Sequence, residues 1–209
     1  DLLAAGRALV RGAVRRAHHE LAGRHSHQLQ LDARRERDAL PDLALAVAAL
    51  ATVSMNSRPS LRMVLLKHCG QDGFVFYTNY NSRKAAELAE NPFAAMTFWW
   101  PAQERQVRIE GKVHRISPEE SDAYFASRPR ENQLSAWASP QSRIVKTPVT
   151  LEEVSTRFGT GNIPRPENWG GFRLVPEVFE FWQGRTGRLH DRILFTQTGS
   201  GWRTDRLAP

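Results

Sequence analysis

The sequence is poor in cysteine, with Cys69 as the only one among its 209 residues. A single cysteine excludes an intrachain disulfide and a zinc site built from several thiolates, and it suits a reducing compartment. The sequence also has no apolar run near the roughly 20 residues that a membrane-spanning helix needs. We therefore expect a cytoplasmic protein with no metal site and no membrane partner.

Familiar short motifs and acidic residues are scarce as well. The phosphate-binding GxxxxGK[ST] loop, the dinucleotide-binding GxGxxG and the metalloprotease HExxH do not occur, and no Ser-His-Asp pattern can be placed. Asp and Glu number 22 against 29 Lys and Arg, which gives a formal net charge of +7. This excess favours anionic partners, namely nucleic acid, a membrane surface or phosphorylated small molecules.

Aromatic residues are absent before Phe74. Residues 1–44 are instead rich in Ala, Leu, Arg and His, and the apolar residues of 10–21 recur at helical spacing. We expect a helical N-terminal appendage over 1–44 and the main domain over 45–209. A remnant of a targeting sequence is the alternative, which the acidic residues of this region weaken. Because the chain begins at Asp1 rather than Met, we also expect an earlier segment to be missing.

From about residue 46 the pattern changes to short β-strands separated by turn residues. The expected strands are 46–53, 61–68, 74–80, 94–100, 105–116, 171–176, 178–184, 189–197 and 201–207. The second and third of these read as one hairpin, and the fourth and fifth as another. Many antiparallel strands at this spacing predict a mainly β fold, a barrel or a sandwich, and we favour a β-barrel decorated by helices.

Three helices are expected between the strands, beginning at Ser82, Ser117 and Thr150, each a residue type that caps a helix N-terminus. The first turn of the helix at Ser82 carries Arg83 and Lys84. Cations there oppose the helix dipole, whereas a bound anion such as phosphate would accept hydrogen bonds from the free backbone amides. The alternative is that both side chains extend into solvent, and the sequence favours neither.

Further candidate ligand contacts are spread along the chain. Arg62 and Lys67 lie five residues apart on one expected strand, so a regular strand directs them to opposite faces. Gln106 lies on a long strand, where a glutamine is more often exposed to solvent than functional. Gln141 and Ser142 lie in a loop, where such side chains often hydrogen-bond a ligand.

Two other groupings combine aromatic and basic side chains. Tyr124 and Arg128 are four residues apart, so on a helix they would share a face and could hold a phosphate. Arg128 could equally satisfy carbonyls at the helix end. In the segment 181–192, Arg188 and His190 would share one face of an extended chain, and Leu189 would point into the barrel.

The residues alone therefore predict a basic, aromatic-lined β-barrel that binds small phosphorylated ligands. A nucleic-acid binder is disfavoured, because the aromatic residues lie within expected strands rather than on a basic surface. We accordingly expect no nucleic-acid partner.

The sequence resembles the pyridoxine/pyridoxamine 5′-phosphate oxidase family in several blocks of residues. The similar blocks are 62-RMVLLK-67, 76-FYTN-79, 82-SRK-84, 104-ERQVRIEGKV-113, 124-YFASRPR-130, 136-AWASPQS-142, 169-WGGF-172, 179-FEFWQGRTGRLHDR-192 and 205-DRLAP-209. They occur in order and span about three quarters of the chain. The segment 179–192 is close to diagnostic of the family.

The resemblance implies a split β-barrel homodimer that binds FMN at the subunit interface. The implied FMN contacts are Arg62, Met63, Val64, Leu65, Tyr77, Thr78, Arg83, Lys84, Gln106, Gln141, Ser142, Trp182 and Arg192. The implied substrate contacts are Lys67, Tyr124, Arg128, Asn132, Arg188 and His190, the last two being catalytic. The implied reaction oxidises pyridoxine or pyridoxamine 5′-phosphate to pyridoxal 5′-phosphate, with transfer of hydride to the flavin and reoxidation by molecular oxygen to give hydrogen peroxide.

The sequence departs from the family pattern in two places. Asn132 stands where the family usually has Ser, and Ser135 stands where Gly is usual. Residues 1–44 do not resemble the family, and the basic, Tyr-containing segment that closes over the substrate is not recognisable there. The alternative function is therefore a catalytically weak split-barrel protein that binds flavin or pyridoxal phosphate.

Overall fold

The computed structural model describes residues 47–209, with the exception of residues 71, 148 and 200. The helical appendage predicted over 1–44, and the boundary that follows it, lie outside the described residues. In the described part, strands predominate and helices occupy the connections between them. The prediction of a mainly β fold with helices is confirmed.

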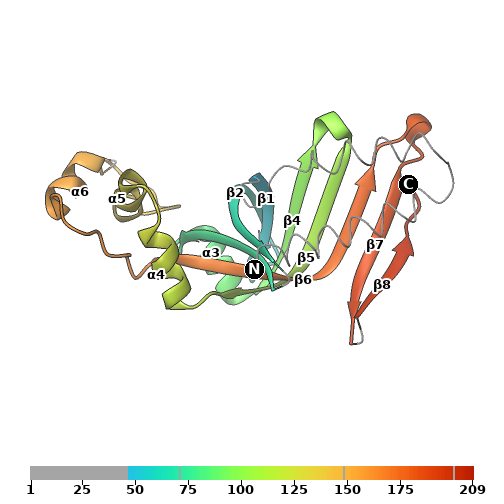
Figure 1. Ribbon diagram of the computed structural model, residues 1–209, viewed down its shortest axis with the longest axis horizontal. Helices are drawn as coiled ribbons and strands as arrows, with labels where there is room; N and C mark the ends of the chain where they lie inside the picture. Colours follow the sequence, from blue (N-terminus) through green and yellow to red (C-terminus); the bar gives the residue numbers. More distant parts are fainter. Residues whose placement is uncertain (1–46, 71, 148, 200) are drawn as a thin grey trace.

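Eight antiparallel strands form one sheet in the order β3-β2-β1-β4-β5-β6-β7-β8. The strands are β1 (Val47–Val53), β2 (Pro59–Gly70), β3 (Gly73–Asn79), β4 (Phe93–Trp100), β5 (Arg105–Arg115), β6 (Trp169–Gln183), β7 (Asp191–Thr198) and β8 (Gly201–Arg206). Because β3 also pairs with β6, the first six strands close into a barrel. β7 and β8 continue the sheet beyond the barrel, on the right of Figure 1.

The pairings confirm both predicted hairpins and correct one prediction. β2 pairs with β3, and β4 pairs with β5, as the sequence indicated. The two short strands expected over 171–184 are one continuous strand, β6. The register of β5 against β6 shifts between Glu110, which lies opposite Val178, and Gly111, which lies opposite Pro176, so β6 has one extra residue there. Its length lets β6 pair with β3, β5 and β7.

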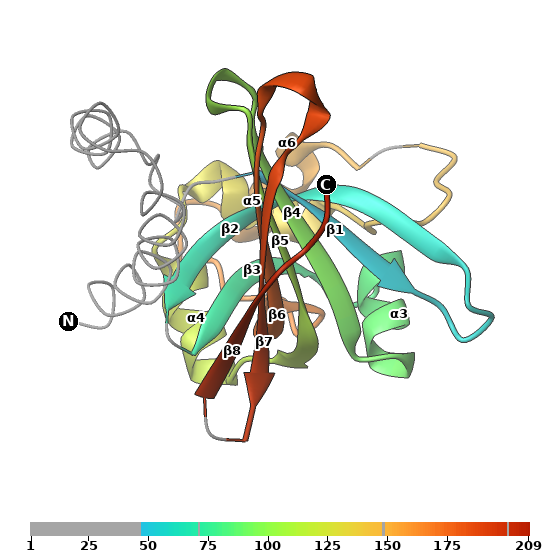
Figure 2. The same ribbon diagram turned by 90° about the vertical axis from the view of Figure 1, so that its right-hand side faces the viewer.

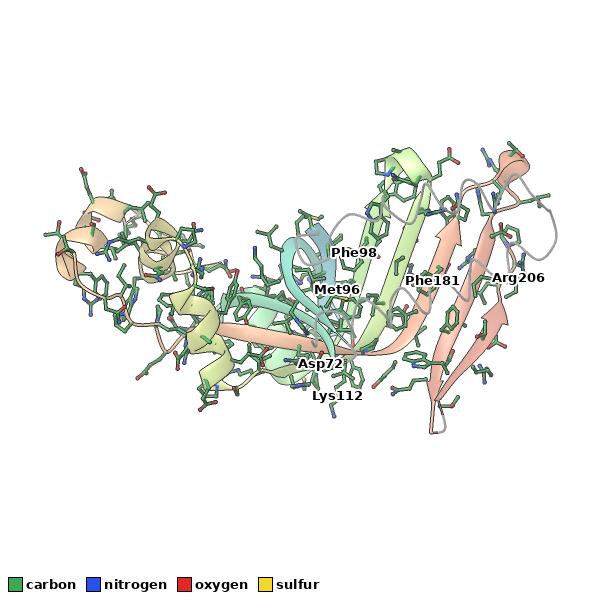
Figure 3. All side chains as sticks on the ribbon, in the orientation of Figure 1. Asp72, Met96, Phe98, Lys112, Phe181 and Arg206 are labelled. Carbon is green, nitrogen blue, oxygen red and sulfur yellow. The ribbon has the colours of Figure 1, made fainter. Side chains whose placement is uncertain are left out.

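The main core fills the barrel with aliphatic and aromatic side chains. Leu50, Leu66, Phe76 and Met96 are fully buried, and Phe98 is 2% exposed. Figure 3 labels Met96 and Phe98, which lie two residues apart on β4 and therefore on the same side of the strand. Alternate residues of each strand supply this core because side chains of a strand point to opposite faces in turn. β5 contributes Ile109 to this core, and Val107 packs against it.

Helices cover the barrel and its ends. They are α3 (Arg83–Glu90), α4 (Pro118–Ala126), α5 (Arg130–Ala138) and α6 (Leu151–Phe158). α3 packs against β1, α4 packs against β6, and α5 packs against α6. Figure 2 shows α3 and α4 on opposite sides of the barrel. Within the described residues, no helix is long and apolar enough to cross a membrane.

The three predicted helix starts are observed, but their caps differ. Thr150 forms the complete capping box with Glu153 at the start of α6, and Gly159 ends that helix. At α4 the Ser117 hydroxyl accepts a hydrogen bond from the Glu120 amide. Ser82 occupies the cap position of α3, yet its side chain makes no capping hydrogen bond. The free amides at the start of α3 are therefore left for another partner.

The connection between β6 and β7 is a tight turn rather than the extended segment expected. Thr186–Arg188 form a single 3₁₀ turn (η3), in which Gly187 and Arg188 have φ values of 69° and 61°. A left-handed pair reverses the chain direction, so side chains no longer alternate as in a strand. Leu189 is 72% exposed and does not point into the barrel, so that prediction was wrong.

We predict that Gly111→Ala destabilises the barrel by about 1–3 kcal/mol. A Cβ at this position would lie 2.0 Å from the Val175 carbonyl oxygen and 3.0 Å from the Pro176 Cα, and backbone atoms cannot give way. Urea unfolding measures the change. Gly199→Ala is the control, because a Cβ there meets nothing within 4 Å. Equal stability of the two variants would contradict the close packing of β5 on β6.

Candidate active site

A groove runs along the outer face of β2, between α3 and α4. Its larger part has a volume of about 420 Å³. The residues that line it are Met63, Val64, Leu65, Lys67, Tyr77, Thr78, Asn79, Lys84, Tyr124, Arg128, Ser135, Ala136, Ser139, Gln141 and Trp169. A smaller part of about 390 Å³ adjoins it, lined by Ser60, Leu61, Arg62, Met63, Arg83, Lys84, Gln141 and Ser142. Three shared residues join the two parts into one site of ligand-binding size.

We call the smaller part of the groove the narrow end and the larger part the wide end. Lys84 lines both parts and is the most buried cation of the narrow end. Its side chain is 8% exposed, and Nζ donates to Thr78 Oγ1 at 3.0 Å and to Gln141 Oε1 at 2.9 Å. Burial, together with the nearby positive charge of Arg62, lowers the pKa of Lys84 to about 8. A buried ammonium beside a guanidinium is electrostatically unfavourable, and an anion bound between them would relieve both effects.

The wide end is walled by a stack of three aromatic rings. The Tyr77 ring lies 3.9 Å from the Tyr124 ring and 5.3 Å from the Trp169 ring, with interplanar angles of 21° and 13°. These residues come from β3, α4 and β6, so the fold brings together segments far apart in sequence. Burial raises the pKa of both tyrosines, which keeps their hydroxyls neutral donors.

Arg128 lies over this stack with a donor that has no partner. Its guanidinium carbon is 4.6 Å from the Trp169 ring centroid, a cation–π geometry. Its Nη1 atom is buried and makes no hydrogen bond with any described residue. Burial lowers the pKa of Arg128, and the nearby Tyr124 does not compensate fully. Because Arg128 also lines the groove, this unpaired N–H is a candidate donor to an oxyanion.

Tyr124 and Arg128 meet in the groove by a different route from the one predicted. α4 ends at Ala126, so Arg128 does not share its helical face with Tyr124. Pro129 follows Arg128, and a proline disfavours helical geometry in the residue before it. The chain leaves the helix and still places both side chains on the same groove wall.

A second group of predicted residues lies elsewhere, on the outer face of β5, β6 and β7. Gln106 faces Trp182 across β5 and β6, and Trp182 faces Arg192 across β6 and β7. The His190 ring lies 4.6 Å from the Trp182 ring. Arg188, in the turn beside them, is exposed. This extension projects away from α5 and α6, as Figure 1 shows.

The predicted residues thus fall into two separate sets. The groove holds Arg62, Met63, Val64, Leu65, Lys67, Tyr77, Thr78, Arg83, Lys84, Tyr124, Arg128, Gln141 and Ser142. Gln106, Trp182, Arg188, His190 and Arg192 do not line the groove of the same chain. Arg62 and Lys67 do lie on opposite faces of β2, since Arg62 bonds to the Leu50 carbonyl while Lys67 lines the wide end.

Asn132 belongs to neither set. It is exposed on α5, and it is Ser135, one turn later, that lines the groove. The prediction also missed Trp169, although the aromatic residue beside the pair Gly170 and Gly171 was a usable signal. A Cβ on Gly171 would come within 3.0 Å of the Tyr77 ring, so these glycines let the rings approach.

Comparison with known proteins decides the family. Residues 39–157 match the family described as pyridoxamine 5′-phosphate oxidase. Residues 169–209 match the pyridoxine 5′-phosphate oxidase C-terminal dimerisation region. The chain belongs to the pyridoxamine 5′-phosphate oxidase family. The resemblance inferred from the sequence motifs is confirmed, and this family is one of oxidoreductases.

Relatives named pyridoxine/pyridoxamine 5′-phosphate oxidase are similar to this chain over most of its length. The protein from Paraburkholderia phymatum is 54% identical over 165 residues, which is 77% of each chain. The protein from Burkholderia thailandensis is 56% identical over 167 residues, which is 77% of this chain and 78% of the relative.

Two solved structures share the fold. PhzG from Burkholderia lata, in complex with tetrahydrophenazine-1-carboxylic acid, is 28% identical with a TM-score of 0.75 over 90% of this chain and 95% of that one. A pyridoxamine 5′-phosphate oxidase-related, FMN-binding protein from Nostoc punctiforme is 21% identical with a TM-score of 0.67, covering 95% and 97%. The predicted split-barrel fold is therefore confirmed.

We predict that Arg128→Met leaves the ligand-free protein within about 1 kcal/mol of its original stability. The lost cation–π contact is offset by removal of an unsatisfied buried donor. The same variant should lose part of the thermal stabilisation that inorganic phosphate gives. Arg157→Met is the matched control, since Arg157 also stacks on a ring, Trp137, but does not line the groove. Equal responses to phosphate in both variants would contradict an anion site at Arg128.

Proposed function

We propose that the protein oxidises pyridoxine 5′-phosphate or pyridoxamine 5′-phosphate to pyridoxal 5′-phosphate with FMN as cofactor and molecular oxygen as acceptor, releasing hydrogen peroxide. The observation that carries the proposal is the presence of two separate cationic points in one groove. Lys84 with Arg62 and Arg83 marks one end, and Arg128 with Lys67 marks the other. A phosphorylated cofactor and a phosphorylated substrate require two such points.

The narrow end fits the cofactor phosphate. Arg62, Arg83 and Lys84 gather beside the start of α3, whose free amides favour an anion. The lowered pKa of Lys84 and the lack of a side-chain cap at Ser82 both support binding of an anion here. The backbone and side chains of Met63–Leu65 and the Thr78 hydroxyl would then contact the flavin ring system.

The wide end fits the substrate. Arg128 Nη1 and the Lys67 ammonium would bind the substrate phosphate, and the Tyr124 hydroxyl would donate to it. The chemistry that FMN supplies when bound is removal of two electrons from the substrate C4′ alcohol or amine, with oxygen as the final acceptor. The protein contributes by orienting the two ligands and by excluding water. Arg188 and His190 would contact the substrate ring and hold charge that changes during oxidation.

A homodimer explains why Arg188 and His190 lie on a different face of the chain from the groove. The outer side chains of β2 are apolar and exposed, with Leu61, Met63 and Leu65 between 53% and 69% accessible. A partner chain that covers this strip could bring its own second set of residues, Trp182, Arg192 and their neighbours, to the groove. The match of residues 169–209 to a dimerisation region supports this arrangement.

The alternative is a split-barrel protein that binds flavin or pyridoxal phosphate but turns over slowly. It is favoured by one observation, the position of Asn132 outside the groove, which leaves fewer substrate contacts than the family pattern implies. The two functions differ in whether flavin binding is accompanied by peroxide release.

The function is tested by measuring hydrogen peroxide with each phosphorylated substrate, alongside mass spectrometry of the released cofactor. We predict that the protein contains FMN, that Arg188→Ala lowers turnover at least tenfold with near-normal flavin content, and that Arg192→Ala loses flavin first. Arg192 Nε donates to Glu180 at 2.7 Å, so it is fixed on its strand, whereas Arg188 is exposed in the turn. Bound FAD, or flavin without any peroxide release, would remove the oxidase proposal.

We predict that FMN binding weakens as pH rises through about 8. Lys84 in the flavin-free protein has a pKa of about 8, and phosphate, a dianion above pH 7, binds its protonated form and raises that pKa. Affinity should be nearly constant between about pH 7 and 7.5 and fall by up to about tenfold per unit above 8. Burial raises the pKa of Cys69 to about 12, so its thiol does not titrate in this range.

The control for this pH dependence is Lys84→Met. This variant loses a charge-assisted hydrogen bond worth about 1.5–3 kcal/mol. It should therefore bind FMN about ten- to a hundredfold more weakly at pH 7. It should also show no slope between pH 7 and 9.5, as followed by flavin fluorescence. A slope that persists in Lys84→Met would assign the titration to another group.

A further inference from the structure

Glu87 is a buried carboxylate at the narrow end of the groove that the sequence did not single out. It lies on α3, and its side chain is 5% exposed. Its Oε2 atom accepts hydrogen bonds from Thr52 and Ser60, both at 2.5 Å, and lies 3.4 Å from Arg62 Nη2. Its Oε1 atom accepts from Arg83 Nε at 2.8 Å. Each oxygen therefore serves a different arginine.

This carboxylate stays charged at every working pH. Burial alone would raise its pKa, but hydrogen bonds from Ser60, Thr52 and Arg83 outweigh burial and hold the pKa of Glu87 at about 2. An ionised carboxylate that is buried must be fully paired, and here both oxygens are. Among the described residues, the three cations that line the narrow end (Arg62, Arg83 and Lys84) together with Glu87, which pairs with two of them, have a net charge of +2.

We propose that Glu87 is a positioning residue for the cofactor phosphate: it holds Arg62 and Arg83 in place and sets the narrow end to the charge that balances a phosphate dianion. The proposal rests on the proposed function, since it takes FMN as the ligand. Arg62 is also held by Thr52 and by the Leu50 carbonyl, whereas Glu87 is the sole ion-pair partner of Arg83 among the described residues. Arg83 is 61% exposed, so Glu87 is what restrains it.

Two physical effects of Glu87 oppose each other and make the proposal testable. Its negative charge near the phosphate should weaken anion binding by simple repulsion. Its hydrogen bonds should strengthen binding, because the guanidinium groups are already ordered before the anion arrives. Charge repulsion alone predicts that Glu87→Gln binds FMN more tightly. Positioning predicts weaker binding, because an amide whose oxygen accepts from Arg83 turns its NH₂ towards Arg62 Nη2, which is also a donor, and the Thr52 and Ser60 hydroxyls would have to accept instead of donate.

The test compares the affinities of Glu87→Gln for FMN and for riboflavin, which lacks the phosphate. We expect FMN affinity to fall about tenfold, the loss of one charge-assisted hydrogen bond, and riboflavin affinity to stay unchanged. Glu90→Gln is the matched control on the same helix, with the same change of charge. Glu90 is exposed and, among the described residues, accepts only from the Met55 amide, at 3.3 Å, so the FMN affinity of Glu90→Gln should not fall. With FMN at saturation, kcat of Glu87→Gln should stay near the original value.

Two further variants separate the outcomes. In an Arg83→Ala background, the effect of Glu87→Gln should shrink, because the two residues act together. If Glu87→Gln does not unfold cooperatively, Thr52→Val decides instead, because Thr52 also donates to Glu87 but does not line the groove, with an expected loss of about two- to fivefold in FMN affinity alone. Unchanged or tighter FMN binding in these variants overturns the positioning role and leaves the proposed function intact. If the unsubstituted protein binds FMN no more tightly than riboflavin, both the positioning role of Glu87 and the proposed function are overturned.

Discussion

The pairing of β3 with β6 is the contact on which the rest of the molecule depends. It turns a sheet into a closed barrel and aligns Tyr77 with Gly171 and Asn79 with Trp169. The aromatic wall of the groove exists only because these strands are neighbours, although about ninety residues separate them in sequence. Closure also buries the side chains of Phe74, Phe76 and Leu174 in one core. Such non-local contacts are entropically expensive to form, so the large apolar interior must compensate for them.

The closed barrel in turn presents cations that it does not neutralise. Lys84 and Arg128 are both buried enough to have lowered pKa values, and neither forms an ion pair with a described carboxylate. By contrast, Arg173 is paired with Glu120, and Arg192 is paired with Glu180. Unpaired buried cations destabilise a protein unless a ligand completes them. Lys84 and Arg128 therefore differ from Arg62 and Arg83, which also line the groove but are already paired with Glu87.

Much of this could be predicted from the sequence. Alternating apolar residues and turn residues gave the strands and both hairpins, because local periodicity records which face is buried. The groove residues were named because their motif spacing is that of the family. What could not be predicted depended on backbone geometry: the left-handed turn at Arg188, the early end of α4 before Pro129, and the continuous course of β6 past Pro176. Glu87 was missed because its role comes from partners on β1 and β2, which only the fold brings to α3.

The separation of the predicted site into two sets is itself an argument about assembly. A chain that used all of these residues for one ligand would need the β6–β7 turn to reach the groove, yet the turn lies on the extension that projects from the barrel (Figure 1). Contacts in a twofold dimer are reciprocal. If the groove of one chain meets the extension of its partner, the groove of the partner also meets the extension of the first chain. The exposed apolar strip on β2 borders the groove directly, through Met63 and Leu65. Burial of that strip against a partner would stabilise the dimer and close the site in the same step, which makes cofactor binding and dimer formation mutually reinforcing.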